Sequence, residues 1–328
     1  MADQKLKTAL KWFFRCLITG GVLYYLFLKI PFSEVITALI SVKIVYLFPA
    51  FFLQIIMRYI NACQLRIFTH QQKMDFSAFE LMKINLVTQF YGLLLPGELS
   101  GSIVKWYKLS KENKMRAQAA ACIALSKTVN LLCLTMLGVV FFLIEMPYNS
   151  VAIAMSLVFG LIASALIYIS VINGKVFYRI ENFVNKLDLS KVPALFQEKI
   201  GKVWNSMKRF REFPISSINY TLFLSCIYHL AGIFAIYLLM EAINIDVPMA
   251  SIIWIRAASI FIQLLPISIS GLGVREGTFV FLLSNYNVSA PAAMALSFII
   301  FGIRVVIALF GGILEARNLF FKKSPIRQ

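Results

Sequence analysis

Residues 264–277, LLPISISGLGVREG, interrupt an apolar region that runs from 250 to 286. Proline and glycine end the first arm of this region. Each arm has about 13–17 residues, or roughly 20–25 Å of helix at 1.5 Å per residue. A hydrocarbon core is about 30 Å thick, so neither arm reaches across it. The interruption therefore predicts a hairpin of two short helices that enters a membrane and leaves on the same side.

The rest of the chain is also apolar. Of its 328 residues, 60% are apolar and 14% are charged, whereas soluble domains carry about 25% charged residues. This composition excludes an ordinary soluble enzyme and a disordered chain. A second interruption, LLLPGELSG at 93–101, divides the apolar region 79–110 in the same way. Six further segments are long enough to cross a bilayer: 11–30, 44–66, 118–144, 151–172, 217–240 and 291–315.

The net charge of +17 comes from 32 Lys and Arg against 15 Asp and Glu. In a soluble protein this balance would suggest a nucleic-acid partner, but in membrane proteins Lys and Arg gather in cytoplasmic loops. Placing both termini in the cytoplasm puts 26 of the 32 bases on that side, with Arg58 counted among them. The first hairpin then enters from the cytoplasm and the second from outside, and we expect no nucleic-acid partner.

These placements predict an all-α polytopic membrane protein with six full spans and two oppositely oriented re-entrant helical hairpins. We expect one membrane domain, 1–328, in which 148–328 repeat the topology of 1–147 upside down without sequence identity. Transporters with such an inverted 4+4 repeat hold substrate near the midplane, where broken helices meet. The insert 173–214 has two amphipathic faces. They predict cytoplasmic helices that lie on an anionic leaflet or pack against the protein itself.

The second hairpin contains six candidate substrate-binding residues: Ser268, Ser270, Gly271, Gly273, Arg275 and Glu276. The serines can bond backbone groups that the break leaves free, and the glycines permit positive φ. A helix that begins near Val274 points free N–H groups at the break, which favours an anion. Arg275 adds donors suited to phosphate or carboxylate. The alternative is a purely structural Arg275–Glu276 pair that holds the hairpin in place.

Other candidates lie in the first hairpin and in the helices around both hairpins: Glu98, Lys105, Lys127, Asn130, Arg256 and Arg304. Lys127 and Asn130 are three residues apart and share one helical face, and Arg304 holds the corresponding place in the last span. This pair of bases suits an anionic head group between the two halves. Lys105 is either a second phosphate contact or a surface base, and Glu98 is either a ligand or a helix cap.

Charge at membrane depth is costly and needs a partner. Four bases are expected there: Lys127, Arg256, Arg275 and Arg304. Three acids are available to them: Glu98, Glu276 and Glu315. At least one base is then unpaired by protein, and a bound phosphate is the natural missing partner.

The sequence contains no catalytic motif that we can identify. Its five cysteines form no CxxC pair, and HExxH, Walker and nucleophile-elbow motifs are absent. The GLG at 271–273 lacks the strand and the later glycine of a dinucleotide site. We therefore expect no enzymatic activity, no metal and no cofactor.

The stretches PISISGLGVREGTFVFLL at 266–283 and LPGELSGSIVKWYKL at 95–109 resemble a known family. It is the flippase-like, lysylphosphatidylglycerol synthase transmembrane-region family, and we expect its membrane part alone, without the soluble aminoacyl-transfer domain. Many members have acids where this chain has Ser102, Ser126 and Asn130, and Arg where it has Lys105 and Lys127. These departures argue against proton or ion coupling through those positions.

The resemblance implies transfer of a lipid, often anionic or glycosylated, between the leaflets of a bacterial inner membrane or an archaeal plasma membrane. We therefore expect a translocase for an anionic phospholipid, a glycolipid or a polyprenyl-phosphate-linked lipid, with membrane lipids as its partners. Two alternatives stay open. One is a membrane enzyme or an accessory subunit of lipid glycosylation, and the other is a secondary transporter of a small anion. The oligomeric state is open, and a homodimer is one option.

Overall fold

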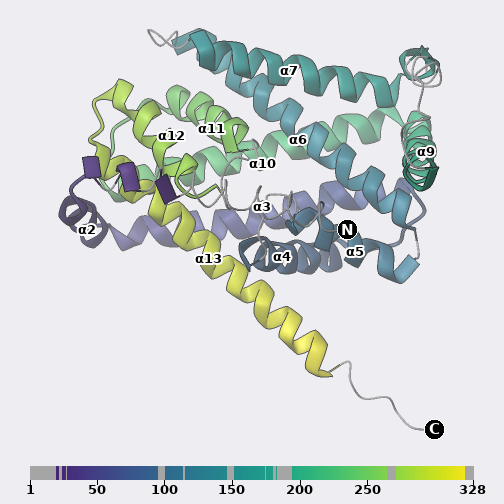
Figure 1. Ribbon diagram of the computed structural model, residues 1–328, viewed down its shortest axis with the longest axis horizontal. Helices are drawn as coiled ribbons and strands as arrows, with labels where there is room; N and C mark the ends of the chain where they lie inside the picture. Colours follow the sequence, from purple (N-terminus) through teal and green to yellow (C-terminus); the bar gives the residue numbers. More distant parts are fainter. Residues whose placement is uncertain are drawn as a thin grey trace.

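The computed structural model describes residues 20–21, 24–26, 28–94, 100–113, 115–145, 151–173, 175–179, 182, 194–263 and 271–321. This described part is helical and contains no strand. Five helices are long and apolar enough to cross a membrane: α3 (Ile44–Gln71), α6 (Arg116–Glu145), α7 (Val151–Ile172), α10 (Ile215–Ala242) and α13 (Ala290–Phe321). Helices α3, α7 and α10 run along the long dimension of the molecule, whereas α6 and α13 cross this direction obliquely (Figure 1).

These helices confirm the predicted all-helical membrane fold, and they coincide with five of the six predicted spans. Most of the sixth, 11–30, lies outside the described residues, so the number of spans stays a prediction. The short helix α2 (Phe32–Ile40) occupies the predicted outer loop 31–43. Its buried Val35 packs with Leu26 and Ile30 against Met294 and Ala295 of α13.

Both interrupted regions form pairs of short helices. The first pair is α4 (Ala78–Leu94) and α5 (Ser100–Asn113), and the second is α11 (Met249–Gln263) and α12 (Val274–Leu283). In each pair the two helices pack against each other. The pairs lie toward opposite ends of the bundle, α11 and α12 toward the end that carries α2 (Figure 1). The breaks themselves, 95–99 and 264–270, lie outside the described residues.

In each half of the chain, the hairpin packs against the last span of the other half. Helix α4 of the first hairpin packs against α13, and α11 of the second packs against α6. A glycine permits each close approach: a Cβ at Gly311 would lie 2.1 Å from the Leu86 carbonyl oxygen, and one at Gly138 would lie 2.5 Å from the Ala257 Cβ. Small residues at such contacts are typical of membrane helices. This reciprocal pairing supports an inverted repeat, which stays a prediction.

The insert 173–214, which was predicted to be cytoplasmic, packs against the protein in its described part. It contains α9 (Ala194–Lys208) and the 3₁₀ turn η2 (Arg209–Glu212). Phe177 and Phe210 are fully buried, and the Phe177 ring stacks 4.2 Å from the Trp204 ring. Phe210 packs edge-on against Phe68 of α3. Of the two alternatives for this insert, the structure thus supports helices held on the protein itself.

Candidate functional site

A polar pocket of about 320 Å³ lies between α3, α4, α5, α10 and α13. Its lining residues are Arg58, Asn61, Asn85, Thr88, Gln89, Gly92, Gly101, Ser102, Lys105, Tyr228 and Arg304. Arg58, Tyr228 and Arg304 each lie near the middle of a long apolar helix. A bilayer around these helices would therefore place the pocket near its midplane, where water is scarce and charge is costly.

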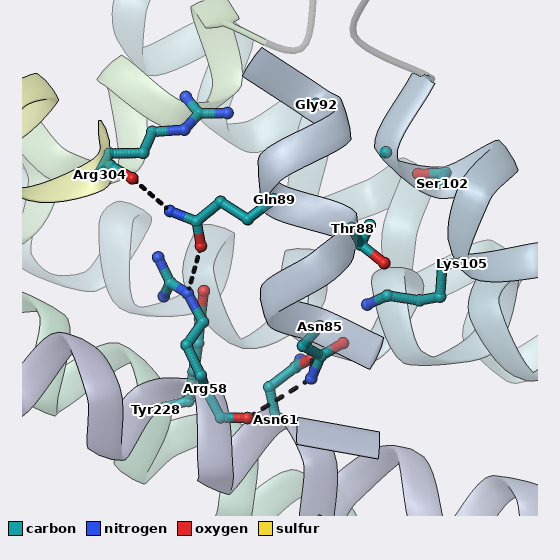
Figure 2. A pocket seen from close by; sticks show the side chains of 11 residues that line it. Arg58, Asn61, Asn85, Thr88, Gln89, Gly92, Ser102, Lys105, Tyr228 and Arg304 are labelled. Atoms are coloured by element: carbon teal, nitrogen blue, oxygen red, sulfur yellow. Dashed lines mark hydrogen bonds between the residues drawn. The ribbon is translucent and has the colours of Figure 1, made fainter. Parts of the chain in front are cut away.

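Hydrogen bonds from α4 fix one wall of this pocket (Figure 2). The Nε of Arg58 donates to Oε1 of Gln89 at 2.9 Å, and Nε2 of Gln89 donates to the backbone oxygen of Arg304 at 3.1 Å. Asn85 donates to Oδ1 of Asn61 at 3.2 Å. Gln89 thus links α3 to α13, and it leaves the terminal nitrogens of Arg58 available to another acceptor.

The opposite wall comes from α5. A Cβ at Gly101 would meet the Thr88 side chain and carbonyl oxygen at 3.2 Å, so glycine lets α5 lie close against α4. This contact brings Ser102 and Lys105 to the pocket. Within the described residues, the Lys105 ammonium has no hydrogen-bond or ion-pair partner. A base without a counter-ion at this depth is a candidate ligand-binding group.

An adjoining pocket of about 450 Å³ shares four lining residues with the polar pocket: Asn61, Ser102, Lys105 and Tyr228. Its other walls include Lys127, Asn130 and a largely apolar set: Leu65, Ile123, Leu131, Leu134 and Ile260. Lys127 donates from Nζ to Oγ of Ser102 at 2.6 Å. The two pockets are therefore neighbours, one polar and one more apolar, and we refer to the two together as the cavity.

Neutral groups satisfy one another behind the adjoining pocket. Asn130 donates to Oε1 of Gln64 at 2.8 Å, and Ser126 donates to the same oxygen at 3.2 Å. Ser225 donates to Oδ1 of Asn130 at 3.0 Å, and the backbone oxygen of Asn130 lies 2.8 Å from Nε2 of His229. Asn130 is thus held in place by hydrogen bonds to three neighbouring helical residues, Gln64, Ser225 and His229.

Arg256 lies behind the cavity on α11. It is 7% exposed, and a Cβ at Gly232 would lie 2.2 Å from its Nη2, so the guanidinium needs a glycine to fit against α10. Its Nε has no hydrogen-bond partner in the part of the chain that the structure describes. Arg58 lies close enough to Arg256 for their charges to repel each other. The same holds for Arg58 and Lys105.

In contrast to Arg256 on α11, the charged residues of α12 are paired within the protein. Arg275 and Glu276 are 3% and 0% exposed and form an ion pair. The Arg275 Nε donates to Oγ of Ser297 at 2.7 Å, and that hydroxyl lies 3.2 Å from Oε1 of Glu276. The other Glu276 oxygen accepts the Gly273 N–H at 2.7 Å, and the Arg275 guanidinium stacks on Phe301. This geometry agrees with the alternative in which Arg275 and Glu276 form a purely structural pair that holds the hairpin in place.

Gly273 and Gly271 support this arrangement. Their φ angles are +80° and +76°, in the left-handed region that glycine adopts at little cost. A side chain at Gly273 would strain the turn that presents its N–H to Glu276. The glycines were predicted for positive φ, and the backbone confirms that requirement.

The structure thus separates the predicted site residues into two groups. Lys105, Lys127, Asn130 and Arg304 surround the cavity, whereas Arg275 and Glu276 line neither of its two pockets. Three candidates, Glu98, Ser268 and Ser270, lie outside the described residues. The substrate-binding roles predicted for these residues and for Arg275 stay predictions.

Arg58, Gln89 and Tyr228 were missed from the sequence. We counted Arg58 among cytoplasmic bases, but in the structure it lines the polar pocket from the middle of α3. An arginine inside an apolar segment of this length is itself a signal of a buried site. Gln89 and Tyr228 gave no such signal, because uncharged polar residues are common in membrane helices.

Among the described residues, no group of His, Cys, Asp or Glu could hold a metal ion. The comparisons with known proteins gave two findings. A family model described as the lysylphosphatidylglycerol synthase TM region matches residues 12–312, which include both hairpins and the cavity. Comparison with curated proteins gave no match.

Proposed function

The chain belongs to the lysylphosphatidylglycerol synthase transmembrane-region family, and from this premise we propose that it moves an anionic lipid between membrane leaflets without altering it chemically. The family suggests a membrane protein of lipid metabolism or lipid translocation. One observation carries the finer proposal. A polar pocket near the middle of the membrane helices is lined by Arg58, Lys105 and Arg304, and no Asp or Glu is among its described lining residues.

The donors around this pocket match the oxygens of a phosphate. Guanidinium groups can bind two phosphate oxygens at once, and Lys105 contributes a compact charge. Ser102, Asn61 and Tyr228 lie at the junction with the adjoining pocket and can donate to ester or sugar oxygens. The apolar walls there, Leu131, Leu134 and Ile260, suit the first carbons of a lipid tail. The cavity would thus replace the water that a head group loses inside a bilayer.

Reciprocal packing supports an alternating movement. The hairpin of each half rests on the last span of the other half, so a small rotation between halves would shift both walls of the cavity together. In transporters with inverted repeats, such a rotation opens a midplane site to each side in turn. No soluble domain is needed for this step, because the lipid tails stay in the hydrocarbon.

We propose to test this function in proteoliposomes that contain a fluorescent phosphatidylglycerol in both leaflets. An impermeant quencher bleaches the outer leaflet, and further loss of fluorescence reports transfer. The wild-type protein should speed this loss. Lys105→Gln removes one charge-assisted hydrogen bond, worth about 1.5–3 kcal/mol, so the transfer rate should fall by about tenfold or more.

Lys111→Gln is the matched control, because Lys111 is exposed on the same helix and lines neither pocket. It should transfer lipid at the wild-type rate. If Lys105→Gln and Arg304→Gln both keep that rate while folding normally, the cavity is not the route. Uptake of radiolabelled phosphate or sulfate without lipid transfer would favour the small-anion alternative instead.

A further inference from the structure

We propose that the transported head group carries at least two negative charges, as a phosphomonoester or a diphosphate does; this inference rests on the proposed function. It follows from the balance of charge around the cavity and from the way the bases are distributed. A head group with a net positive charge, such as one esterified with lysine, is disfavoured by the same argument.

Five bases surround the cavity. Four line one or both pockets and one lies behind them: Arg58, Lys105, Lys127, Arg304 and Arg256. No Asp or Glu lines either pocket among the described residues. Lys127 and Arg304 make further interactions of their own, so the charge argument rests on Arg58, Lys105 and Arg256, which have no acid partner among the described residues.

The neighbouring acids have other partners. Glu276 is enclosed with Arg275 and Ser297. Glu315 accepts two hydrogen bonds from Lys108 at 2.7 and 2.9 Å, and Glu145 accepts one from Ser251 at 2.9 Å. Among the described residues, Arg58, Lys105 and Arg256 therefore give the cavity an excess of positive charge.

Repulsion makes this excess costly in the empty protein. Arg58 lies close enough to repel both Lys105 and Arg256, and Lys127 lies close enough to repel Lys105. Burial weakens the screening that water and salt would otherwise supply. A phosphodiester has one negative charge and offsets only part of this repulsion. A second negative charge on the ligand removes more of it, and a positive charge adds to it.

The bases that line the cavity also form two groups, one on each side of α4. Figure 2 shows Arg58 and Arg304 on the Gln89 side of α4, and Ser102 and Lys105 on the Thr88 side. Lys127 joins the second set through its hydrogen bond to Ser102. Two sets of donors around the cavity suit a ligand with two charged groups, or one dianionic group that both sets contact.

Binding in detergent tests the charge requirement without transport. The probes are short-chain phosphatidic acid, which is a phosphomonoester, phosphatidylglycerol and lysyl-phosphatidylglycerol with the same tails, all at pH 8. Phosphatidic acid should bind at least about tenfold more tightly than phosphatidylglycerol, and lysyl-phosphatidylglycerol should bind more weakly than either. Lys105→Gln should reduce this ratio, whereas Lys111→Gln should leave it unchanged. A water-soluble diphosphate without tails, used as a competitor, tells whether the head group alone is recognised.

Each result has a separate meaning. Equal binding of phosphatidic acid and phosphatidylglycerol, or tighter binding of the lysyl lipid, would overturn the charge requirement while leaving lipid transfer possible. Direct binding of the soluble diphosphate, with no binding of any lipid, would overturn the lipid as the source of the phosphate. Binding of none of these probes, together with no transfer in proteoliposomes, would overturn both the inference and the proposed function.

Discussion

The two hairpins share a plan but differ in how their charges are satisfied. In the second, α11 is buried from Ser251 to Ser259, and Arg275 has its own carboxylate, hydroxyl and aromatic partners. In the first, Lys105 points to a cavity without a described acid. A buried charge that the protein itself pairs serves the fold, whereas one left facing a cavity is available to a ligand. The difference indicates a supporting role for the charges of α12 and a binding role for Lys105 of α5, while Arg256 of α11 lies behind the cavity.

The two hairpins are comparable as halves of an inverted repeat only if they enter the membrane from opposite sides. In a variant without native cysteines, we expect all-or-none labelling by a membrane-impermeant maleimide. Lys111→Cys should react only from the cytoplasm, and Asn287→Cys and Asp246→Cys only from outside. All three positions are exposed. Labelling of Lys111→Cys from outside would contradict both the topology and the inverted repeat.

Removing the charge of Glu276 should have the largest effect on stability. Glu276→Gln leaves Arg275 buried without a counter-ion, which costs about 3–5 kcal/mol. Chemical unfolding in mixed micelles would measure the loss in the free energy of unfolding. Glu34→Gln, an exposed acid on α2, is the control and should change it by less than about 0.5 kcal/mol.

A double variant sharpens this test. Arg275→Gln with Glu276→Gln removes both charges, so it should be less destabilised than Glu276→Gln alone. If the single and double variants unfold alike, the pair is not what holds the second hairpin in place.

The first hairpin should depend more on close backbone packing. Gly311→Ala pushes a methyl group into the Leu86 carbonyl oxygen, so α13 and α4 must separate. Overpacking of this kind costs about 1–3 kcal/mol, and transfer should slow as the cavity wall moves. Gly302→Ala is matched on the same helix, because nothing lies within 4 Å of its Cβ. It should be neutral or slightly stabilising, and a similar loss in both variants would argue against the packing explanation.

The smallest effect on stability is expected at the partly exposed ion pair between the first hairpin and α13. The side chains of Lys108 and Glu315 are 22% and 11% exposed, and they form an ion pair at 2.7 Å. Such partly exposed pairs contribute about 1 kcal/mol or less. Lys108→Gln should therefore lower the free energy of unfolding by no more than this. A loss as large as that of Glu276→Gln would show that the two hairpins are held alike.

The sequence predicted the helices well because hydrophobic length and the Pro–Gly breaks are local signals. The spans 44–66 and 217–240 correspond to α3 and α10. The cavity was harder to predict. Lys127 and Arg304 were identified by their charge and depth, and Lys105 by its place one turn after the first break, although it was also counted among the cytoplasmic bases. Which hairpin would face the cavity depends on contacts between distant helices. Arg58 was assigned to the cytoplasm because the loop-charge rule was applied to a base inside a span.

Arg275 illustrates a second limit of prediction from the sequence. Its sequence neighbour Glu276 was recognised as a partner, but the third member, Ser297, comes from α13 and completes the enclosure. No spacing rule predicts a contact across 22 residues and a loop. The structural and functional alternatives for this arginine therefore could not be separated from the sequence.

The exchanged packing of the halves also constrains how the protein is made. Gln89 bonds to Arg304, which lies 215 residues later, and α4 meets its partner α13 only when the last helix has been synthesised. At about 5–20 residues per second, the interval between them is roughly 10–40 s. During that time α3, which is synthesised first, can already bond Asn85 and Gln89 through Asn61 and Arg58. Only the Nε2 of Gln89, which donates to the Arg304 carbonyl in the finished protein, then has to wait for α13.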